Sequence, residues 1–81
     1  MMNRFLDVKG HSCPLPVLRT RKALLEMPEG AVLTVEATDP ASARDMPSWC
    51  VEAGHQLLES LENDGIFRFR IEKKRFSTNS E

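Results

Sequence analysis

The order of two hydrophobic periodicities constrains this chain more than any other feature of its sequence. Residues 33–38 alternate apolar and polar side chains, with Leu33, Val35 and Ala37 on one side. This is the pattern of a strand with one buried face. A shorter strand signal precedes the breaker Gly10, where Phe5, Leu6 and Val8 interleave with Asp7 and Lys9. Two strands are therefore expected in the first half of the chain.

The last third of the chain predicts a hairpin. Leu57, Glu59 and Leu61 alternate along its first half, and Asn63-Asp64-Gly65 then supplies turn residues. In the second half, three apolar side chains alternate with three charged ones: Phe67, Phe69 and Ile71 with Arg68, Arg70 and Glu72. We expect one apolar face and one solvated face.

Two helices are expected between the strands. The first runs from about Pro14 to Met27, because Pro14 and Pro16 fit a first helical turn and the Pro28–Gly30 stretch stops the helix. Its apolar side is expected to contain Val17, Leu18, Leu24 and Leu25.

The second helix is expected to begin in two steps. Asp39 or Ser42 can cap a first turn, and Asp45 can cap again just before Pro47. Gly54 supplies its end. The order β-α-β-α-β-β then predicts an α/β (α+β) two-layer sandwich, in which a four-stranded mixed sheet carries both helices on one face.

The length of the chain limits the number of domains to one. With 81 residues, it is too short for a Rossmann, kinase or hydrolase fold. We expect a single domain over residues 1–73 and a polar, flexible tail over residues 74–81, where no apolar period is visible.

Charge and termini narrow the functional classes. The chain contains eleven Lys and Arg and twelve Asp and Glu, which gives a net charge of −1. The chain as a whole therefore does not attract nucleic acid, and direct nucleic-acid binding is not expected. The first ten residues, MMNRFLDVKG, contain three charges and no apolar core, so neither a secretory signal nor a membrane anchor is predicted. We expect a cytoplasmic protein without membrane contact.

The chemistry concentrates at Cys13, in the segment GHSCPLP between a strand and a helix. A thiol at a helix N-terminus meets the positive end of the helix dipole, so we expect its pKa to fall below the free value. The amides of Leu15 and Val17 are the nearest donors, and Pro14 and Pro16 stiffen the turn. Such a thiolate can accept sulfur from another protein's persulfide. The alternative is a small side chain buried in the helix packing.

A series of separated motifs accompanies this cysteine along most of the chain: Asp7, Gly10, Cys13-Pro14-Leu15-Pro16, Lys22-Ala23-Leu24, Met27, Gly30, Thr38-Asp39-Pro40, Asp45, Pro47, Cys50, Gly54 and His55. The series resembles the CPxP signature and flanking motifs of the TusA (SirA-like) sulfur-carrier family. The resemblance covers about residues 5–73, and it implies a small two-layer sandwich with persulfide chemistry at Cys13.

The resemblance also implies partners and a role. It implies a relay that takes sulfane sulfur from a cysteine desulfurase or rhodanese-type donor and passes it to a downstream sulfurtransferase acceptor. The pathways implied are tRNA thiolation, molybdenum-cofactor assembly or sulfur oxidation. We therefore expect a sulfurtransferase-type carrier rather than a free-standing enzyme, with no bound cofactor.

The other cysteine and the histidines have two interpretations each. Cys50 is either a resolving thiol or, as its apolar neighbours favour, a packed side chain in the second helix. His11 either assists proton transfer at Cys13 or lies in an exposed loop, and His55 is expected to pack at a helix end. The spacings His11-x-Cys13 and Cys50-x4-His55 do not match common zinc sites, so no metal is expected.

Basic side chains offer docking surfaces and one alternative function. Arg19, Arg21 and Lys22 near the start of the first helix either dock an acidic partner or form an ordinary solvated face. Asp45 is a candidate support or docking residue. A nucleic-acid-binding or regulatory module would instead use a basic cluster: Arg68, Arg70, Lys73, Lys74 and Arg75. A thiol–disulfide regulator would use Cys13 and Cys50.

Overall fold

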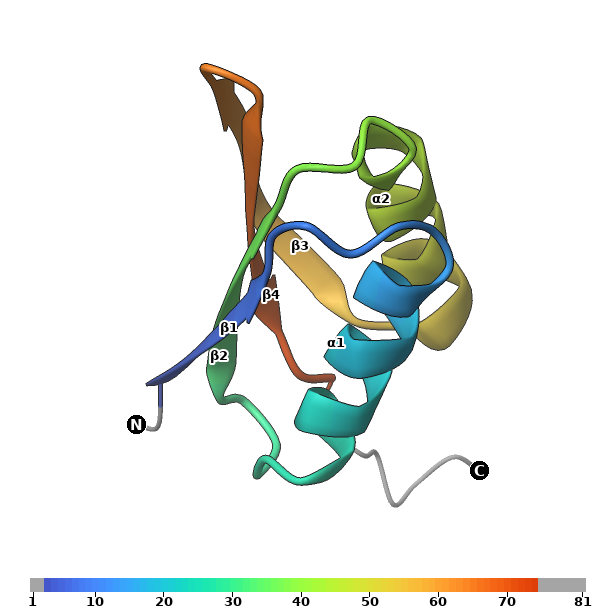
Figure 1. The fold of residues 1–81 in the computed structure, drawn as a ribbon. Coiled ribbons are helices and arrows are strands. Elements are labelled where there is room, and N and C mark those ends of the chain that lie inside the picture. Colours follow the sequence, from blue (N-terminus) through green and yellow to red (C-terminus); the bar gives the residue numbers. More distant parts are fainter. Residues whose placement is uncertain (1–2, 75–81) are drawn as a thin grey trace.

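A computed structural model describes residues 3–74 and contains the expected elements in the expected order. The four strands and two helices are β1 (Asn3–Val8), α1 (Leu15–Leu25), β2 (Val32–Ala37), α2 (Ser42–Ala53), β3 (Gln56–Asn63) and β4 (Ile66–Glu72). The strands form one sheet in the order β1-β2-β4-β3. β1 runs parallel to β2, and β4 runs antiparallel to both β2 and β3. Both helices cover the same face of this sheet (Figure 1), which confirms the predicted two-layer fold.

The core lies between the sheet and the helices. Leu33, Val35 and Ala37 of β2 are fully buried, and Phe69 and Ile71 of β4 lie beside them in register. The helices and β1 contribute further buried side chains, including Val8, Ala23, Leu24, Met46 and Cys50. The alternation in residues 33–38 and 67–72 therefore predicted the buried face of the two central strands correctly.

The buried side of α1 differs from the predicted one. Pro16, Thr20, Ala23 and Leu24 are buried. Leu18 is 51% exposed and Leu25 65% exposed, so their placement on the apolar side was wrong. The buried set follows helical spacing. Leu24 is buried and Val17 packs against the core as predicted, whereas Leu18 and Leu25 lie outside the buried stripe.

Helix α2 forms in one step rather than two. It is continuous from Ser42 through Pro47, and its N-cap residue Ala41 makes no side-chain capping bond. Asp39 accepts a hydrogen bond from the Ala41 amide just ahead of the helix, whereas Asp45 lies inside the first turns and caps nothing. Gly54 ends the helix as predicted, with a left-handed φ of 85° and its amide bonded to the Cys50 and Val51 carbonyls.

The hairpin does not have the single apolar face that was predicted, because β3 contains a bulge. The register between β3 and β4 shifts between Leu57 and Glu59, so one extra residue turns the following side chains to the opposite face. Leu57 pairs with Ile71 and packs against the core, but Leu61 pairs with Arg68 and is 51% exposed. The alternation of Leu57, Glu59 and Leu61 therefore does not produce one apolar stripe.

The described chain continues slightly beyond the last strand. The Lys73 amide donates to the Ala31 carbonyl, and the Lys74 amide donates to Nδ1 of His55. Most of the expected tail, residues 75–81, lies outside the described residues, as does Arg75 of the basic cluster. Among residues 3–74, no helix is long and apolar enough to cross a membrane.

Candidate functional site

The site lies where two loops meet at one end of the sheet. Because β1 and β2 are parallel, the loop leading into α1 and the loop leading into α2 both leave the sheet at its same end (Figure 1). Cys13 is exposed in the first loop, and its peptide bond to Pro14 is cis. Pro14 is the N-cap residue of α1 and Pro16 is the second residue of the helix. The two prolines therefore occupy the positions at a helix start that the sequence predicted.

The Cys13 thiol faces a carboxylate of α2. Its Sγ donates a hydrogen bond to Oδ2 of Asp45 at 3.1 Å. This hydrogen bond, followed by desolvation and the negative charges of Asp45 and Asp39, raises the pKa of the Cys13 thiol, while Arg44 acts in the opposite direction. The prediction of a lowered pKa was wrong, because it considered the helix dipole and not the Asp45 carboxylate, whose direct contact stabilises the protonated sulfur.

The backbone donors at the helix start also differ from the prediction. The Leu15 amide donates to the Ser12 carbonyl at 2.9 Å and closes a local turn, so it is not directed at the sulfur. Val17 lies beside Cys13 in a shallow depression of about 300 Å³, whose other walls are Pro14, Asp45, Ser48, Trp49 and Glu52. The thiol is thus presented in an open, partly acidic hollow between the two helices.

Comparison with known proteins identifies the family. The model of the sulfurtransferase TusA family matches residues 4–73. The chain is 47% identical over 68 residues to the sulfur carrier protein TusA of Allochromatium vinosum, covering 84% of this chain and 90% of that protein. It is 45% identical over 69 residues to the TusA of Pseudomonas entomophila, covering 85% and 86%.

This chain belongs to the TusA family. A crystal structure of a SirA-like protein from Desulfitobacterium hafniense agrees, with a TM-score of 0.78 and 34% identity over 89% of this chain and 99% of that one. The family resemblance inferred from the CPxP segment and the predicted fold are both confirmed.

The remaining cysteine and histidines lie apart from the TusA-family CPxP loop or make no bond to its thiol. Cys50 is only 1% exposed, and burial raises the pKa of its thiol to about 11. Nδ1 of His11 is buried without a hydrogen-bond partner within residues 3–74. The His55 ring lies 5.3 Å from that of Trp49, and burial, followed by the charges of Lys74 and Lys73, lowers its pKa. No three His, Cys, Asp or Glu residues in this part of the chain form a potential metal site.

The basic side chains of α1 are exposed and do not line the depression at Cys13. Arg19, Arg21 and Lys22 all face solvent. Arg21 instead lines a second groove of about 430 Å³. Trp49 and Glu52 line both this groove and the depression at Cys13. A docking role for these three residues remains a prediction.

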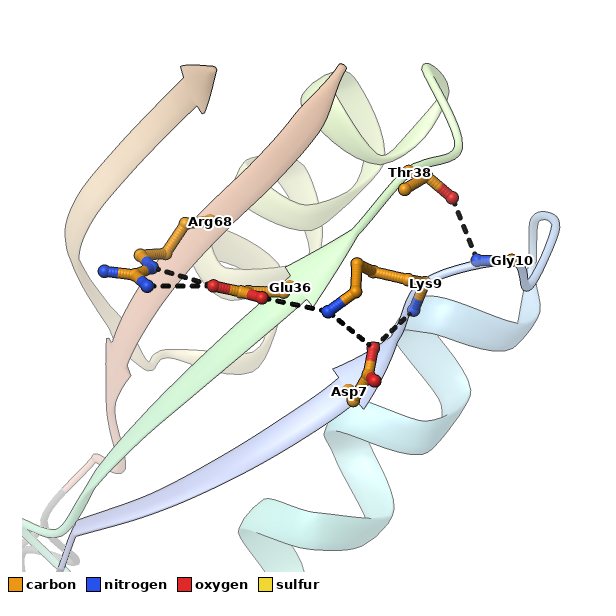
Figure 2. A network of polar contacts seen from close by, with 6 residues as sticks. All are labelled: Asp7, Lys9, Gly10, Glu36, Thr38 and Arg68. Atoms are coloured by element: carbon orange, nitrogen blue, oxygen red, sulfur yellow. Dashed lines mark hydrogen bonds and ion pairs between the residues drawn. The ribbon is translucent and has the colours of Figure 1, made fainter. Parts of the chain in front are cut away.

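A charged network crosses the helix-free face of the sheet next to the site loop. Lys9 Nζ lies 3.3 Å from Asp7 and 3.1 Å from Glu36, and the Arg68 guanidinium binds the other oxygen of Glu36 with two nitrogens (Figure 2). The hydrogen bonds from Arg68 and Lys9 lower the pKa of Glu36. Arg70 pairs with Glu59 at 3.9 Å. Two arginines of the predicted basic cluster are therefore paired with carboxylates of the fold.

The sequence analysis considered Asp39 as a helix cap and as part of the Thr38-Asp39-Pro40 motif, but it did not connect this residue to the thiol. Its Oδ2 accepts a hydrogen bond from the Cys13 amide at 2.6 Å. The sequence analysis also did not identify Ser48, Trp49 and Glu52 as neighbours of Cys13. One signal was available: side chains that follow two adjacent parallel strands meet at the same sheet edge, so residues after β2 are expected near residues after β1.

Proposed function

We propose that Cys13 carries sulfane sulfur as a persulfide, taken from a cysteine desulfurase or rhodanese-type donor protein and passed to a downstream sulfurtransferase in the cytoplasm. The observation that carries this proposal is the contrast between the two cysteines of the chain. Cys13 is exposed in the CPxP segment that marks the TusA family, whereas Cys50 is enclosed by the core. The candidate end uses are tRNA thiolation, molybdenum-cofactor assembly and sulfur oxidation.

The transfer step needs no oxidant and no bound cofactor. The Cys13 thiol releases its proton, and its sulfur attacks the terminal sulfur of the donor's cysteine persulfide. The sulfur–sulfur bond of the donor breaks, and the donor cysteine leaves as a thiolate that takes up a proton. Cys13 then carries a terminal S–H on its own sulfur. The same exchange, with Cys13 as the leaving group, passes the sulfur to an acceptor thiol.

The surroundings of Cys13 fit a carrier that relies on its partners. The depression is open and about 300 Å³ in volume, so a partner's cysteine loop can reach the thiol. Asp45 stabilises the protonated thiol, which keeps the free protein less reactive toward adventitious electrophiles. A donor that presents a cation to Asp45 weakens this stabilisation at the moment of transfer.

The two alternative functions find less support. An intramolecular disulfide needs Cys50 to leave the core, where it is 1% exposed and its pKa is raised to about 11. Phosphate binding through the hairpin would compete with the ion pairs that Arg68 and Arg70 make with Glu36 and Glu59. Phe69 is fully buried and Phe67 packs against the core, so neither ring is free to stack on bases.

Sulfur loading with radiolabelled cysteine tests the proposal. The protein is incubated with a cysteine desulfurase and the label, separated from the donor without reductant, and counted before and after dithiothreitol. Wild type and Cys50→Ala are expected to retain reducible label, and Cys13→Ser is expected to retain none. Equal loss in Cys13→Ser and Cys50→Ala, with both variants folded, would overturn the assignment of the carrier role to Cys13.

A further inference from the structure

Apart from His11, which is partly buried, the loop that carries Cys13 has little packing of its own. Gly10, Ser12, Cys13 and Pro14 are exposed, and the local backbone bonds of the loop include one from the His11 amide to the Val8 carbonyl and one from the Leu15 amide to the Ser12 carbonyl. A loop with so few buried contacts needs other contacts to hold a single conformation.

Those contacts come from the residues that directly follow β2. Oγ1 of Thr38 accepts a hydrogen bond from the Gly10 amide at 2.9 Å (Figure 2), and Oδ2 of Asp39 accepts one from the Cys13 amide at 2.6 Å. Two adjacent side chains thus hold the loop at two amides three residues apart. Backbone amides bonded to fixed acceptors restrict the position of the side chain that follows.

Asp39 also connects the loop to α2. Its second carboxylate oxygen accepts from the Ala41 amide at 3.3 Å, and its carbonyl accepts from the Ser42 amide at 2.9 Å. Helix α2 carries Asp45, whose carboxylate accepts a hydrogen bond from the Cys13 thiol. One residue therefore links both partners of the thiol–carboxylate contact, the amide of Cys13 on one side and the helix that presents Asp45 on the other.

We propose that Thr38 and Asp39 are positioning residues for the Cys13 thiol: they hold the loop in the conformation that places the sulfur against Asp45. This inference rests on the proposed role of Cys13 as sulfur carrier. Its test, however, needs no sulfur donor, because the position of the loop is measurable on the free protein.

Threonine variants isolate the positioning effect, since they change no charge. Thr38→Val removes the acceptor for the Gly10 amide, and Thr38→Ser restores it. Thr34→Val is the matched control, because Thr34 lies in β2 four residues before Thr38, and its side chain makes no hydrogen bond within residues 3–74. For the second anchor, Asp39→Ala removes both acceptor oxygens, and Asp39→Asn keeps one of them.

Two measurements follow the loop: hydrogen exchange of the Gly10 and Cys13 amides by NMR, and the pH profile of Cys13 alkylation by iodoacetamide. We expect Thr38→Val to speed exchange at Gly10, and Asp39→Ala at Cys13, by about tenfold or more. The alkylation profile of Thr38→Val moves to lower pH as the thiol leaves Asp45, and Thr38→Ser returns it to the wild-type profile. Asp39→Asn recovers part of the protection of the Cys13 amide.

Two results would overturn the proposal. One is exchange and alkylation in Thr38→Val and Asp39→Ala that match the Thr34→Val control. The other is faster exchange with an unchanged alkylation profile, which would make these bonds structural only. Should Asp39→Ala fail to fold, Thr38→Val and Asp39→Asn decide the question. Failure of wild type to load sulfur would instead contradict the proposed function and leave these measurements standing.

Discussion

The pH dependence of stability provides a quantitative test of whether Cys50 is buried as an un-ionised thiol while Cys13 is exposed. The Cys50 side chain is 1% exposed among the core residues of α2, and burial raises the pKa of its thiol from about 9 to about 11. The perturbation is Cys50→Ala, which removes the titrating group and leaves a gap the size of one sulfur atom. At pH 7 we expect this variant to be about 1 kcal/mol less stable than wild type.

The sign of the pH dependence follows from proton binding. Between pH 9 and pH 11 the unfolded chain loses the Cys50 proton while the folded protein keeps it, so the unfolded state binds fewer protons and stability falls as pH rises. The two pKa values differ by about 2, and each tenfold change in proton affinity corresponds to about 1.36 kcal/mol. Wild type therefore loses about 3 kcal/mol in total from this group, and about half of it by pH 10.

The assay is urea unfolding under a phosphine reductant at pH 7, 8, 9 and 10, followed by the fluorescence of the single tryptophan, Trp49. Other groups, Cys13 included, titrate alike in both proteins and cancel in the difference. We expect the advantage of wild type at pH 7 to shrink above pH 9 and to reverse by pH 10. Parallel stability curves for wild type and Cys50→Ala across this range would refute the burial of Cys50 as an un-ionised thiol.

Three further predictions concern the site and the framework. Asp45→Asn removes the carboxylate that holds the Cys13 proton, so the iodoacetamide profile moves to lower pH and the rate at pH 7 rises; an unchanged profile would contradict this role. Phe69→Ala, at a fully buried position, is expected to cost about 3–5 kcal/mol in urea unfolding, and a loss below about 1 kcal/mol would contradict its place in the core. Gly54→Ala forces a φ of 85° on a residue with a Cβ and is expected to cost about 1 kcal/mol, whereas Gly54→Asn, which tolerates this conformation, is expected to cost less.

The sequence predicted the fold wherever one periodicity dominated a segment. The alternation around Val35 and Phe69 is unambiguous, and each of these residues is fully buried as expected. The prediction failed where a local irregularity carries no sequence signature. The bulge between Leu57 and Glu59 reverses the facing of Leu61, and no glycine or proline marks its position. In α1 apolar residues lie on more than one side of the helix, and the side that contains Thr20, Ala23 and Leu24 is buried while Leu18 and Leu25 are exposed.

The sequence predicts which residue is reactive but not the electrostatics around it. A cysteine between a strand and a proline-flanked helix start predicts Cys13 as the reactive group, and the structure leaves this thiol exposed beside Asp45. The direction of its pKa depends on Asp45, which is 32 residues away in the chain and reaches the sulfur only through the packing of α2. Local reasoning from the helix dipole omits such a contact. The contact between Asp39 and the Cys13 amide could have been predicted, since parallel pairing of β1 and β2 brings their following residues together.

The most direct test of the central claim is site-resolved mass spectrometry of the wild-type protein after loading by a cysteine desulfurase and cysteine. Free thiols and persulfides are alkylated, the chain is digested, and the peptides that contain Cys13 and Cys50 are compared. We predict a gain of one sulfur atom, about 32 daltons, on the Cys13 peptide alone, removed by reductant before alkylation. Added sulfur on the Cys50 peptide, or none on the Cys13 peptide with an active donor, would contradict the account.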